Sequence, residues 1–279
     1  DLLSAKGDIA PNKILGKNVT VKLELHDGST RHFNGYVTRF QQVGAHGRYH
    51  AYHATVRPWL WFLTRTADCR IFQEKTVPEI IKQVFGDHSI ADIKDELTYT
   101  YRKRTYCVQY RETDFNFVSR LMEEEGIYYF FTHAEGRHTL VLADAYSAHA
   151  PAKGYETLQY IDSERLVRPE QEYISQWNHS CEIQSGKYEI DDYDFERPSV
   201  ELAVRSKMAR EHALSDYEIY DYPGEYLKTA DGEQYVDARI DELQARFEIA
   251  RGESNARGLA PGRLFKLTGQ SRADQNREY

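Results

Sequence analysis

Residues 106–144 read YCVQYRETDFNFVSRLMEEEGIYYFFTHAEGRHTLVLAD, and this stretch decides the fold. It begins with Tyr106–Tyr110, a short run of residues that favour β-structure. Thr113 follows, and its hydroxyl oxygen can accept a hydrogen bond from the free amides of a helix that starts at Asp114. The sequence therefore predicts a strand that leads directly into a capped helix.

The predicted helix has one apolar stripe and a defined end. Val118, Leu121, Met122 and Glu125 follow the i, i+3, i+4, i+7 spacing, and the apolar members line the stripe. Gly126 then supplies the left-handed backbone that ends a helix. Ile127–Thr132 (IYYFFT) is rich in residues that suit a pleated strand, and Ala134–Gly136 turns the chain into a further strand, Thr139–Ala143. We expect a β-α-β-β unit.

Two features of this unit conflict with local rules. Glu123–Glu125 lie in the last helical turn, where the helix dipole disfavours anions by up to about 1 kcal/mol each. Groups outside the unit are expected to offset this cost, and the acidic run is either a solvated face or a subunit contact. Tyr128–Phe131 place two aromatic side chains on each face of their strand. We therefore expect that strand to be covered on both sides.

The segment before this unit predicts an antiparallel sheet. Val19–Leu25 alternates apolar and polar residues, and Asp27-Gly28 is a strong hairpin signal. The second strand runs past Asn34-Gly35 toward Phe40, and a turn at Gly44–Gly47 leads into a third strand, Arg48–Arg57. Pro58 stops that strand. Three antiparallel strands indicate the start of a barrel or sandwich.

A buried segment and a helix follow this sheet. Trp59–Leu63 is too apolar for a surface loop, so it plugs the end of the sheet or begins a buried helical turn. Thr76 and Glu79 form a capping box, with Pro78 in the first turn. An apolar stripe then runs to Gly86 and comprises Val77, Ile80, Ile81, Val84 and Phe85. The following residues, Ser89–Tyr106, are expected to form a connector and a strand.

Beyond Asp144 the sequence becomes loop-like and stays polar through Arg168-Pro169, which indicates a domain transition. Tyr173–Ile183 then alternates apolar and polar residues, Gly186 turns the chain, and Lys187–Glu196 returns. We expect this segment to be a second hairpin. Val200–Val204 fits both a strand and a helix, and its pattern does not decide between them.

The C-terminal part predicts a strand, a long helix and a final strand. Tyr217–Tyr222 ends at a Pro-Gly turn, and Asp231–Arg251 carries the helical stripe Val236, Ile240, Leu243 and Phe247. Glu242 and Arg246 have the spacing of a favourable ion pair on that helix. We expect Gly252–Gly262 to be a flexible turn region and Leu264–Thr268 to be a strand.

Composition limits the function classes. The 279 residues carry a net charge of −8 from 44 acidic and 36 basic side chains that are mixed along the chain, so nucleic acid is not an expected partner. Cys69, Cys107 and Cys181 are far apart and form no CxxC pair, which favours neither a disulfide framework nor a zinc site. No run suits a membrane span, and residues 1–6 lack the apolar core of a signal peptide. Aromatic residues reach 13%, which favours broad contact surfaces.

Searches for catalytic and ligand-binding motifs find none of the common ones. GxSxG, HExxH, GxxxxGK[ST] and GxGxxG are all absent. His133 and His138 flank a predicted turn and are expected to face each other, but a third metal ligand is not evident. His50 and His53 are three residues apart on a strand, so they point to opposite faces and cannot chelate one ion.

An acidic row and a glycine-rich segment remain. Asp192, Asp194 and Glu196 alternate with aromatic residues, which predicts three carboxylates on one face of a strand. Such a row suits calcium or a glycosidase, or it discourages wrong pairing at a sheet edge. Gly258–Gly262 lacks the Lys-Ser/Thr of a phosphate loop, so we interpret it as a turn that enters a strand. We therefore assign no catalytic, cofactor-binding or metal residues.

Several motifs together resemble one family. Besides residues 106–144, they are RPWLWFL (Arg57–Leu63), DCRIF (Asp68–Phe72), DYDFERP (Asp192–Pro198), YDYPG (Tyr220–Gly224) and RGLAPGRLFKLTG (Arg257–Gly269). Nearly the whole chain resembles the N-terminal region of VgrG proteins, the spike components of type VI secretion systems. These proteins are related to the baseplate hubs of contractile phage tails.

The resemblance implies a fold and a mechanical role. The expected fold is β-rich α+β, like a phage tail hub: a first barrel-like domain (1–75), an α/β insertion (76–145) and a second barrel-like domain (146–279) that lacks its C-terminal end. The implied function is a homotrimeric hub, not an enzyme, that joins the Hcp tube to the membrane-puncturing spike with its tip or effector proteins. Such a hub is assembled in the bacterial cytoplasm and secreted without a signal peptide.

Two rival functions remain at this stage. A carbohydrate-active enzyme or sugar-binding β-domain would use tyrosines for stacking and the acidic residues Asp192, Asp194 or Glu196 as acid and base. A phage tail baseplate hub would share the fold and the mechanics of the secretion hub.

Overall fold

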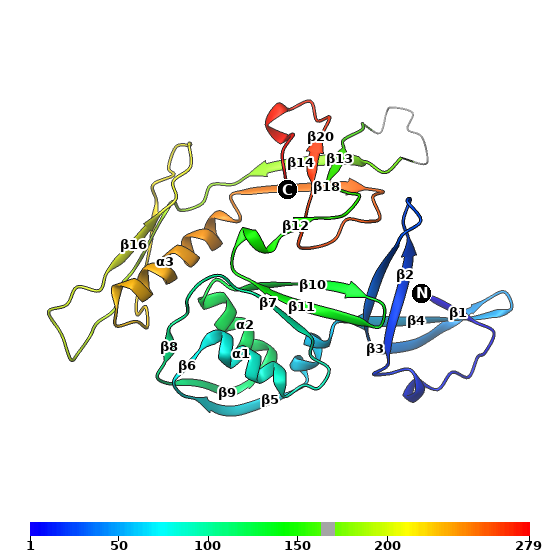
Figure 1. Cartoon of the computed structure of the whole chain (residues 1–279), viewed down its shortest axis with the longest axis horizontal. Coiled ribbons are helices and arrows are strands. Elements are labelled where there is room, and N and C mark those ends of the chain that lie inside the picture. The colour runs from blue at the N-terminus through cyan, green and yellow to red at the C-terminus, as the bar shows by residue number, and fades with distance from the viewer. Residues whose placement is uncertain (163–170) are drawn as a thin grey trace.

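The computed structural model describes residues 1–162 and 171–279. The predicted polar stretch at Arg168-Pro169 lies outside these residues. The fold is elongated and β-rich, with few helices (Figure 1). The α-helices of the described part are α1 (Val77–Gly86), α2 (Asp114–Glu124) and α3 (Thr229–Gln244). Short 3₁₀ helices span Pro11–Lys13, Trp59–Thr64, Tyr146–Ala148 and Ala273–Gln275.

The N-terminal sheet has the strand order β1-β4-β3-β2 and is antiparallel throughout. Its strands are β1 (Leu2–Ser4), β2 (Asn18–Glu24), β3 (Thr30–His46) and β4 (Tyr49–Arg57). The hairpin turn at Asp27-Gly28 is confirmed, because the Asp27 carboxylate accepts from the Ser29 amide at 2.9 Å. The turn predicted at Gly44–Gly47 is confirmed only at its end: β3 continues to His46 through a bulge, and the turn lies at Gly47.

The β-α-β-β unit is confirmed as β9 (Cys107–Thr113), α2, β10 (Tyr128–Ala134) and β11 (Arg137–Ala143). Thr113 caps α2 by accepting from the Asn116 amide at 3.1 Å. Gly126 has φ +70°, the left-handed conformation that ends the helix. β10 pairs with β11, and β11 runs parallel to β7 (Ile93–Glu96).

The helix α1 completes a layered core around this unit. Thr76 and Glu79 form the predicted capping box, and the whole predicted stripe of α1 is buried. The helices α1 and α2 lie between the β10-β11-β7 sheet and the pair of β5 (Ala67–Phe72) with β9 (Figure 1). Trp59, Leu60 and Leu63 of the 3₁₀ helix also enter this core. Beside it, β6 (Lys75–Thr76) pairs with β8 (Lys103–Arg104).

The predicted second hairpin is wrong in its pairing. The strand β14 (Ile174–Cys181) forms, but it pairs with β18 (Glu248–Ser254), about 70 residues later. β15 (Lys187–Ile190) pairs instead with β16 (Val204–Lys207) and β17 (Glu218–Asp221). The alternation of apolar and polar residues specifies which face of a strand is apolar. It does not determine which strand pairs with it.

The predicted helix from Asp231 to Arg251 is too long. α3 ends at Gln244, and the residues that follow form β18. The ring of Phe247 has left the helical stripe and stacks on His212 at 5.5 Å. Because β18 extends through Ser254, the first part of the predicted flexible region 252–262 is a strand. Arg239, not Arg246, pairs with Glu242 at 3.1 Å.

Short parallel pairs close the C-terminal part. β12 (Ala150–Pro151) pairs with β19 (Arg263–Leu264), and β13 (Thr157–Gln159) pairs with β20 (Lys266–Thr268). The predicted strand Leu264–Thr268 is therefore interrupted at Phe265, whose backbone amide donates to the Tyr279 carbonyl at 3.0 Å. Leu267 and Ile174 are buried at the centre of this part.

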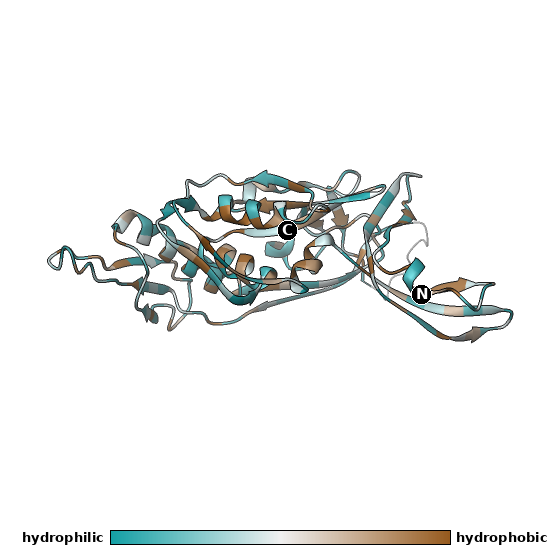
Figure 2. Cartoon of the chain, turned by 90° about the horizontal axis from the view of Figure 1, so that it is seen from below, coloured by the Kyte–Doolittle hydropathy of each residue, from teal (hydrophilic) through white to brown (hydrophobic). Residues whose placement is uncertain are grey.

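Burial is uneven along the chain. The three apolar cores lie in the helical insertion, under α3 and beside β20, whereas the N-terminal sheet projects from the body (Figures 1 and 2). Among the residues of β1–β4, all of them described, only the apolar side chains of Val37 and Tyr52 are buried. Within the described ranges, no helix combines the length and apolar character that crossing a bilayer requires.

Candidate functional site

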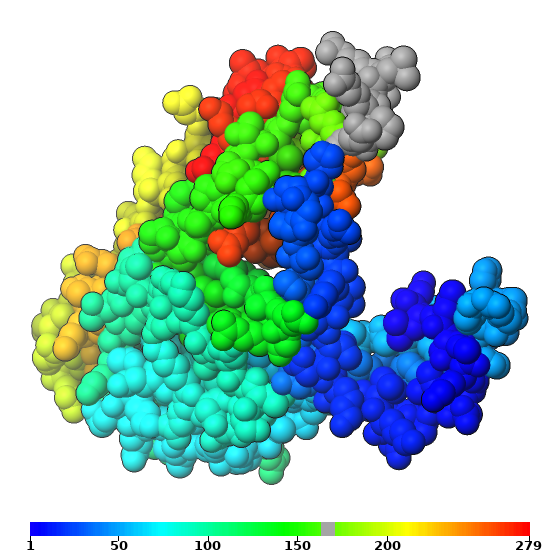
Figure 3. Space-filling view, turned by 45° about the vertical axis from the view of Figure 1, so that its right-hand side comes forward, coloured from blue at the N-terminus to red at the C-terminus, as the bar shows by residue number. Residues whose placement is uncertain are grey.

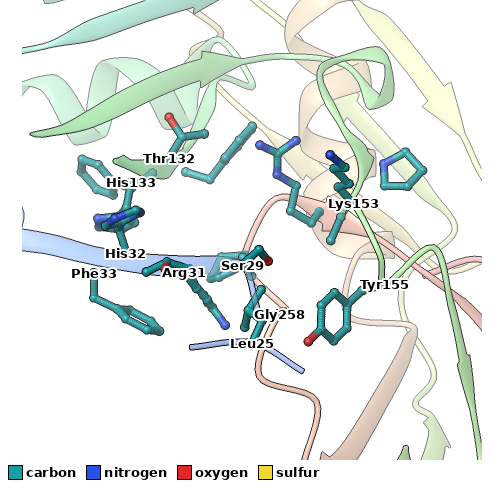
Figure 4. Close-up of a pocket in the computed structure, with 18 of the residues that line it drawn as sticks. Leu25, Ser29, Arg31, His32, Phe33, Thr132, His133, Lys153, Tyr155 and Gly258 are labelled. Carbon is teal, nitrogen blue, oxygen red and sulfur yellow. The ribbon is translucent and has the colours of Figure 1, made fainter. Parts of the chain in front are cut away.

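A cleft of about 790 Å³ lies between the N-terminal sheet and the rest of the molecule. One wall is the turn and start of the β2–β3 hairpin, another is β10, and the third comes from residues 151–155 and 258–263. Figure 3 shows the surface hollowed between the blue N-terminal hairpin and the green segments. Figure 4 shows side chains from these distant segments facing a shared space.

Two arginines connect the walls of the cleft. Arg31 of β3 donates to the Arg257 carbonyl at 2.6 Å, and Arg257 donates to the Glu24 carbonyl at 2.9 Å. The Arg31 guanidinium also lies over the Phe33 ring, 4.5 Å from its centroid. Partial burial lowers the pKa of Arg31 from its usual value. These contacts fix the N-terminal hairpin against the C-terminal loop.

The cleft carries further positive charge. Lys153 and Arg263 both line it, and within residues 1–162 and 171–279 neither side chain forms a salt bridge. Among the described residues that line the cleft, Asp27 is the single carboxylate. The cleft therefore combines cationic side chains with aromatic walls, a combination that suits an acidic, aromatic partner segment.

The aromatic strand β10 is covered on both faces, as predicted, and residues of the same chain provide the cover. Tyr129 and Phe131 pack against the helical core. On the other face, Tyr128 stacks on His149 at 5.6 Å, and Phe130 lies 5.3 Å from the same ring. Tyr129, Phe130 and Phe131 nevertheless reach the edge of the cleft.

A glycine at the cleft makes room for this strand. Gly262 has φ +75°, and a Cβ added there would lie 2.3 Å from the Phe130 ring. Position 262 therefore accepts only glycine without displacement of Phe130. The predicted role of 258–262 as a turn into a strand is confirmed, because the Arg263 amide donates to the Ala260 carbonyl at 3.2 Å and β19 begins there.

His133 and His138 face each other across the β10–β11 turn as predicted, with ring centroids 5.9 Å apart. Both rings bind Asn34 of the N-terminal sheet. The backbone amide of Asn34 donates to His133 Nδ1 at 3.1 Å, and its side-chain oxygen lies 2.7 Å from His138 Nδ1. His138 Nε2 accepts from the Trp59 amide at 2.8 Å. The pair joins the N-terminal sheet to the insertion.

This network keeps both imidazoles neutral. Burial lowers the pKa of His138 to about 4, and the neighbouring His133 acts in the same direction. Burial also lowers the pKa of His133. In the described part of the chain, no group of three or more His, Cys, Asp or Glu side chains is arranged to hold a metal ion. His50 and His53 lie elsewhere, with His53 2.9 Å from the Asp1 carboxylate and His50 against Gly7.

The predicted acidic row does not form. Residues 191–196 are a loop, since the carboxylates bind local amides and so stabilise a turn. Asp194 is buried and accepts from the amides of Glu196 and Arg197 and from the Arg197 guanidinium, at 2.8–3.2 Å. Burial opposes ionisation of Asp194, but these hydrogen bonds lower its pKa overall. Asp192 accepts instead from the amides of Tyr193 and Tyr226.

The acidic end of α2 is partnered within the chain. Arg104 of β8 lies 2.8 Å from both Glu124 and Glu125, and Arg239 of α3 lies 3.8 Å from Glu123. Groups outside the unit therefore offset the unfavourable helix dipole, as expected. Glu125 is buried, so it belongs neither to a solvated face nor to a subunit contact.

The sequence patterns missed an exposed aromatic group at the α3 end of the molecule. Its large side chains are Tyr193 (56% exposed), Phe195 (78%), Tyr217 (57%), Tyr220 (58%) and Tyr222 (54%). Alternation had placed Phe195 on one face of a strand, where burial would be ordinary. Its exposure depends on the Asp194 turn and on pairings between distant segments, which no local pattern reveals.

The family model described as phage tail baseplate hub (GPD) matches residues 1–279, and the chain belongs to that family. Among its relatives is the type VI secretion system spike protein VgrG1b of Pseudomonas aeruginosa, 52% identical over the whole chain and over 38% of the relative. VgrG1a of the same organism is 50% identical over the whole chain and 43% of its own length. The resemblance to VgrG proteins is confirmed, and the chain spans about two fifths of these relatives.

Solved structures share the fold. The E. coli c3393 protein, described as a type VI secretion component similar to T4 bacteriophage tail proteins gp27 and gp5, matches with a TM-score of 0.67 at 20% identity. The match covers 96% of this chain and 58% of that one. A 43 kDa tail protein of prophage MuSo2 from Shewanella oneidensis matches with a TM-score of 0.57 at 10% identity, over 91% of this chain and 80% of that one. A β-rich fold of the phage tail hub type is confirmed.

Proposed function

We propose that this chain is the hub region of a type VI secretion spike and acts as a homotrimeric adaptor between the secreted tube and the spike. Its relatives are named as spike proteins of that system. A hub works through stiffness and shape complementarity, so it needs contact surfaces and no nucleophile. Its role is mechanical, and we propose that this region is not an enzyme.

The observation that carries this proposal is the exposed N-terminal sheet. Its strands bury the apolar side chains of Val37 and Tyr52 alone, while Leu3 and Val21 are more than half exposed. A sheet is stable when an apolar face packs against another layer. In a homotrimer, a neighbouring copy would pack against the N-terminal sheet of each subunit and supply the layer that this sheet lacks.

The partners follow from this role. The hub would bind the Hcp tube hexamer at one end and carry the spike, with its tip or effector proteins, at the other. We propose assembly in the bacterial cytoplasm, followed by secretion through the type VI apparatus. Net charge −8 and the mixed surface charges support the interpretation that nucleic acid is not a partner.

We also propose that residues 1–75 and 146–279 contribute two barrel-like domains around the insertion 76–145. The contacts of Arg31 and Arg257 support close association of the two outer parts. Trp59 and Phe72 pack in the core of the insertion, so residues 59–72 join the first domain to the insertion.

The carbohydrate-active alternative has lost its support, because Asp194 binds within its own turn and the three carboxylates do not share a face. A phage baseplate hub shares this fold. The roughly 50% identity to curated spike proteins favours the secretion hub over a phage tail component.

Sedimentation over a concentration series tests the proposal. We expect a trimer that Val21→Lys weakens, because a charge on the exposed sheet would be buried between copies. Ile71→Lys is the matched control, since Ile71 is equally exposed at 58% but lies on β5, which pairs with β9 of the insertion. The wild-type trimer should also co-sediment with tube hexamers. A chain that remains monomeric at every concentration would overturn the proposal.

A further inference from the structure

Phe195 is held outward at the tip of a rigid turn. It is the most exposed large apolar side chain in the described part of the molecule, at 78%. Asp194 fixes this turn by accepting from two backbone amides and from the Arg197 guanidinium, and Arg197 also donates to the Leu227 carbonyl at 3.2 Å. An aromatic side chain on a preorganised turn loses little conformational entropy on binding, so it suits an interface anchor.

The turn is also acidic. Residues 191–197, here called the knob, read DDYDFER and so contain four carboxylates and one arginine. Asp194 pairs with Arg197, whereas Glu196 is exposed and forms no ion pair within residues 1–162 and 171–279. A partner for the knob must therefore accept an aromatic ring beside negative charge.

The cleft has the complementary chemistry. Lys153 and Arg263 bring positive charge without a salt-bridge partner among the described residues, and Phe33 and Phe130 provide aromatic surface. Its volume of about 790 Å³ exceeds what one aromatic side chain occupies, so the Phe195 ring and its neighbouring side chains can enter it. Complementary charge across an interface favours the correct partner and its register.

We propose that the knob of one copy occupies the cleft of a neighbouring copy. The knob lies in the loop between β15 and β16, at the opposite end of the molecule from the N-terminal sheet (Figure 1). Each chain thus carries one knob and one cleft on different surfaces. Such a head-to-tail contact generates a closed ring of three copies when it relates neighbouring copies by a three-fold rotation. The inference rests on the proposed homotrimer and assigns its specific contact.

A disulfide formed between two differently substituted chains tests this contact directly. The background is Cys69→Ser with Cys181→Ser, which removes the two exposed thiols. Phe195→Cys in one chain and Thr132→Cys in the other place thiols on the knob and in the cleft. We expect a linked dimer when the two chains are mixed and oxidised. Linkage only between two Phe195→Cys chains would show a two-fold contact and overturn the proposal.

Assembly measurements provide the second test. Phe195→Ala should raise the dissociation constant of the trimer at least about ten-fold, as loss of an interface anchor does. Glu196→Arg and Arg263→Glu should each weaken assembly, and the double variant should recover most of the loss. Tyr110→Ala is the control, because Tyr110 is 64% exposed but lies on β9 of the insertion.

The outcomes separate this inference from the proposed function. A wild-type trimer that Phe195→Ala leaves unchanged contradicts the knob contact and leaves the homotrimer in place. Binding of the knob variants to tube hexamers would then show whether the knob serves another partner. A wild-type chain without any trimer contradicts both proposals.

Discussion

Arg104 at the end of β8 and Glu125 at the C-terminal end of α2 form a buried ion pair, with 2.8 Å between Nη2 and Oε1. Tyr235 of α3 donates its hydroxyl to the same carboxylate oxygen at 3.3 Å. Burial raises the pKa of Glu125, and the contact with Arg104 offsets only part of that effect. One carboxylate therefore connects the insertion to the C-terminal helix.

Removing Arg104 should strongly destabilise the fold. In Arg104→Met, Glu125 would remain buried without its charged partner, a situation that costs about 3 kcal/mol or more. Chemical denaturation measures the loss. Arg120→Met is the control, because its contact with Glu112 is partly exposed to solvent and is worth about 1 kcal/mol. A loss no greater than that of the control would show that Glu125 does not depend on Arg104.

Gly126→Val should cost about 1 kcal/mol or more in the free energy of unfolding. Gly126 has φ +70°, which a β-branched residue resists, and an added Cβ would lie 3.2 Å from the Ala238 Cβ of α3. Gly86→Ala is the matched control at the end of α1. Gly86 has open space around it, so this change should stabilise the helix by roughly 0.5 kcal/mol. Unchanged melting of Gly126→Val would show that α2 does not end at this glycine.

Stability should fall as the pH decreases from about 6.5 toward 4, because of His138. Its pKa is about 4 in the folded protein and near 6.5 when unfolded, so the unfolded state binds more protons in this window. The free energy of unfolding should decrease by about 2 kcal/mol between about pH 7 and pH 5 from this group. Above about pH 6.5 its contribution is complete and flat.

Urea unfolding at the two pH values tests this dependence. His138→Asn removes the titrating group, so the variant should show a smaller change in stability between the two conditions than the wild type. His26→Asn is the control, because His26 is exposed on the β2–β3 turn. Equal pH dependence in wild type and His138→Asn would contradict the assignment.

Local chemistry made part of this fold predictable from sequence. Thr76 and Thr113 cap their helices, and Gly126 ends α2, because each acts on amides or backbone angles within a few residues. The β14–β18 pairing joins Ile174 to Ser254, and such distant pairing is set by packing of the whole chain. The hairpin expected after Gly186 was therefore wrong, although its strands exist.

The candidate contact surfaces depend on the same distant relationships. His133 and His138 could be placed opposite each other, since a hairpin turn separates them by only a few residues. Their partner Asn34 lies about 100 residues earlier, and no spacing rule connects it to them. Phe195 and Arg263 likewise belong to local sequence patterns, and these patterns do not reveal that the two side chains are exposed.

Asp194 should matter for assembly although it does not face the proposed cleft. In Asp194→Ala the amides of Glu196 and Arg197 lose their acceptor, so Phe195 would be carried on a mobile loop and would have to be ordered on binding. We expect the trimer to weaken several-fold in sedimentation, even though the aromatic anchor is retained. Asp194→Asn keeps one acceptor for these amides and should fall between the wild type and Asp194→Ala. Assembly of Asp194→Ala equal to that of the wild type would show that rigidity of the turn contributes nothing to the contact.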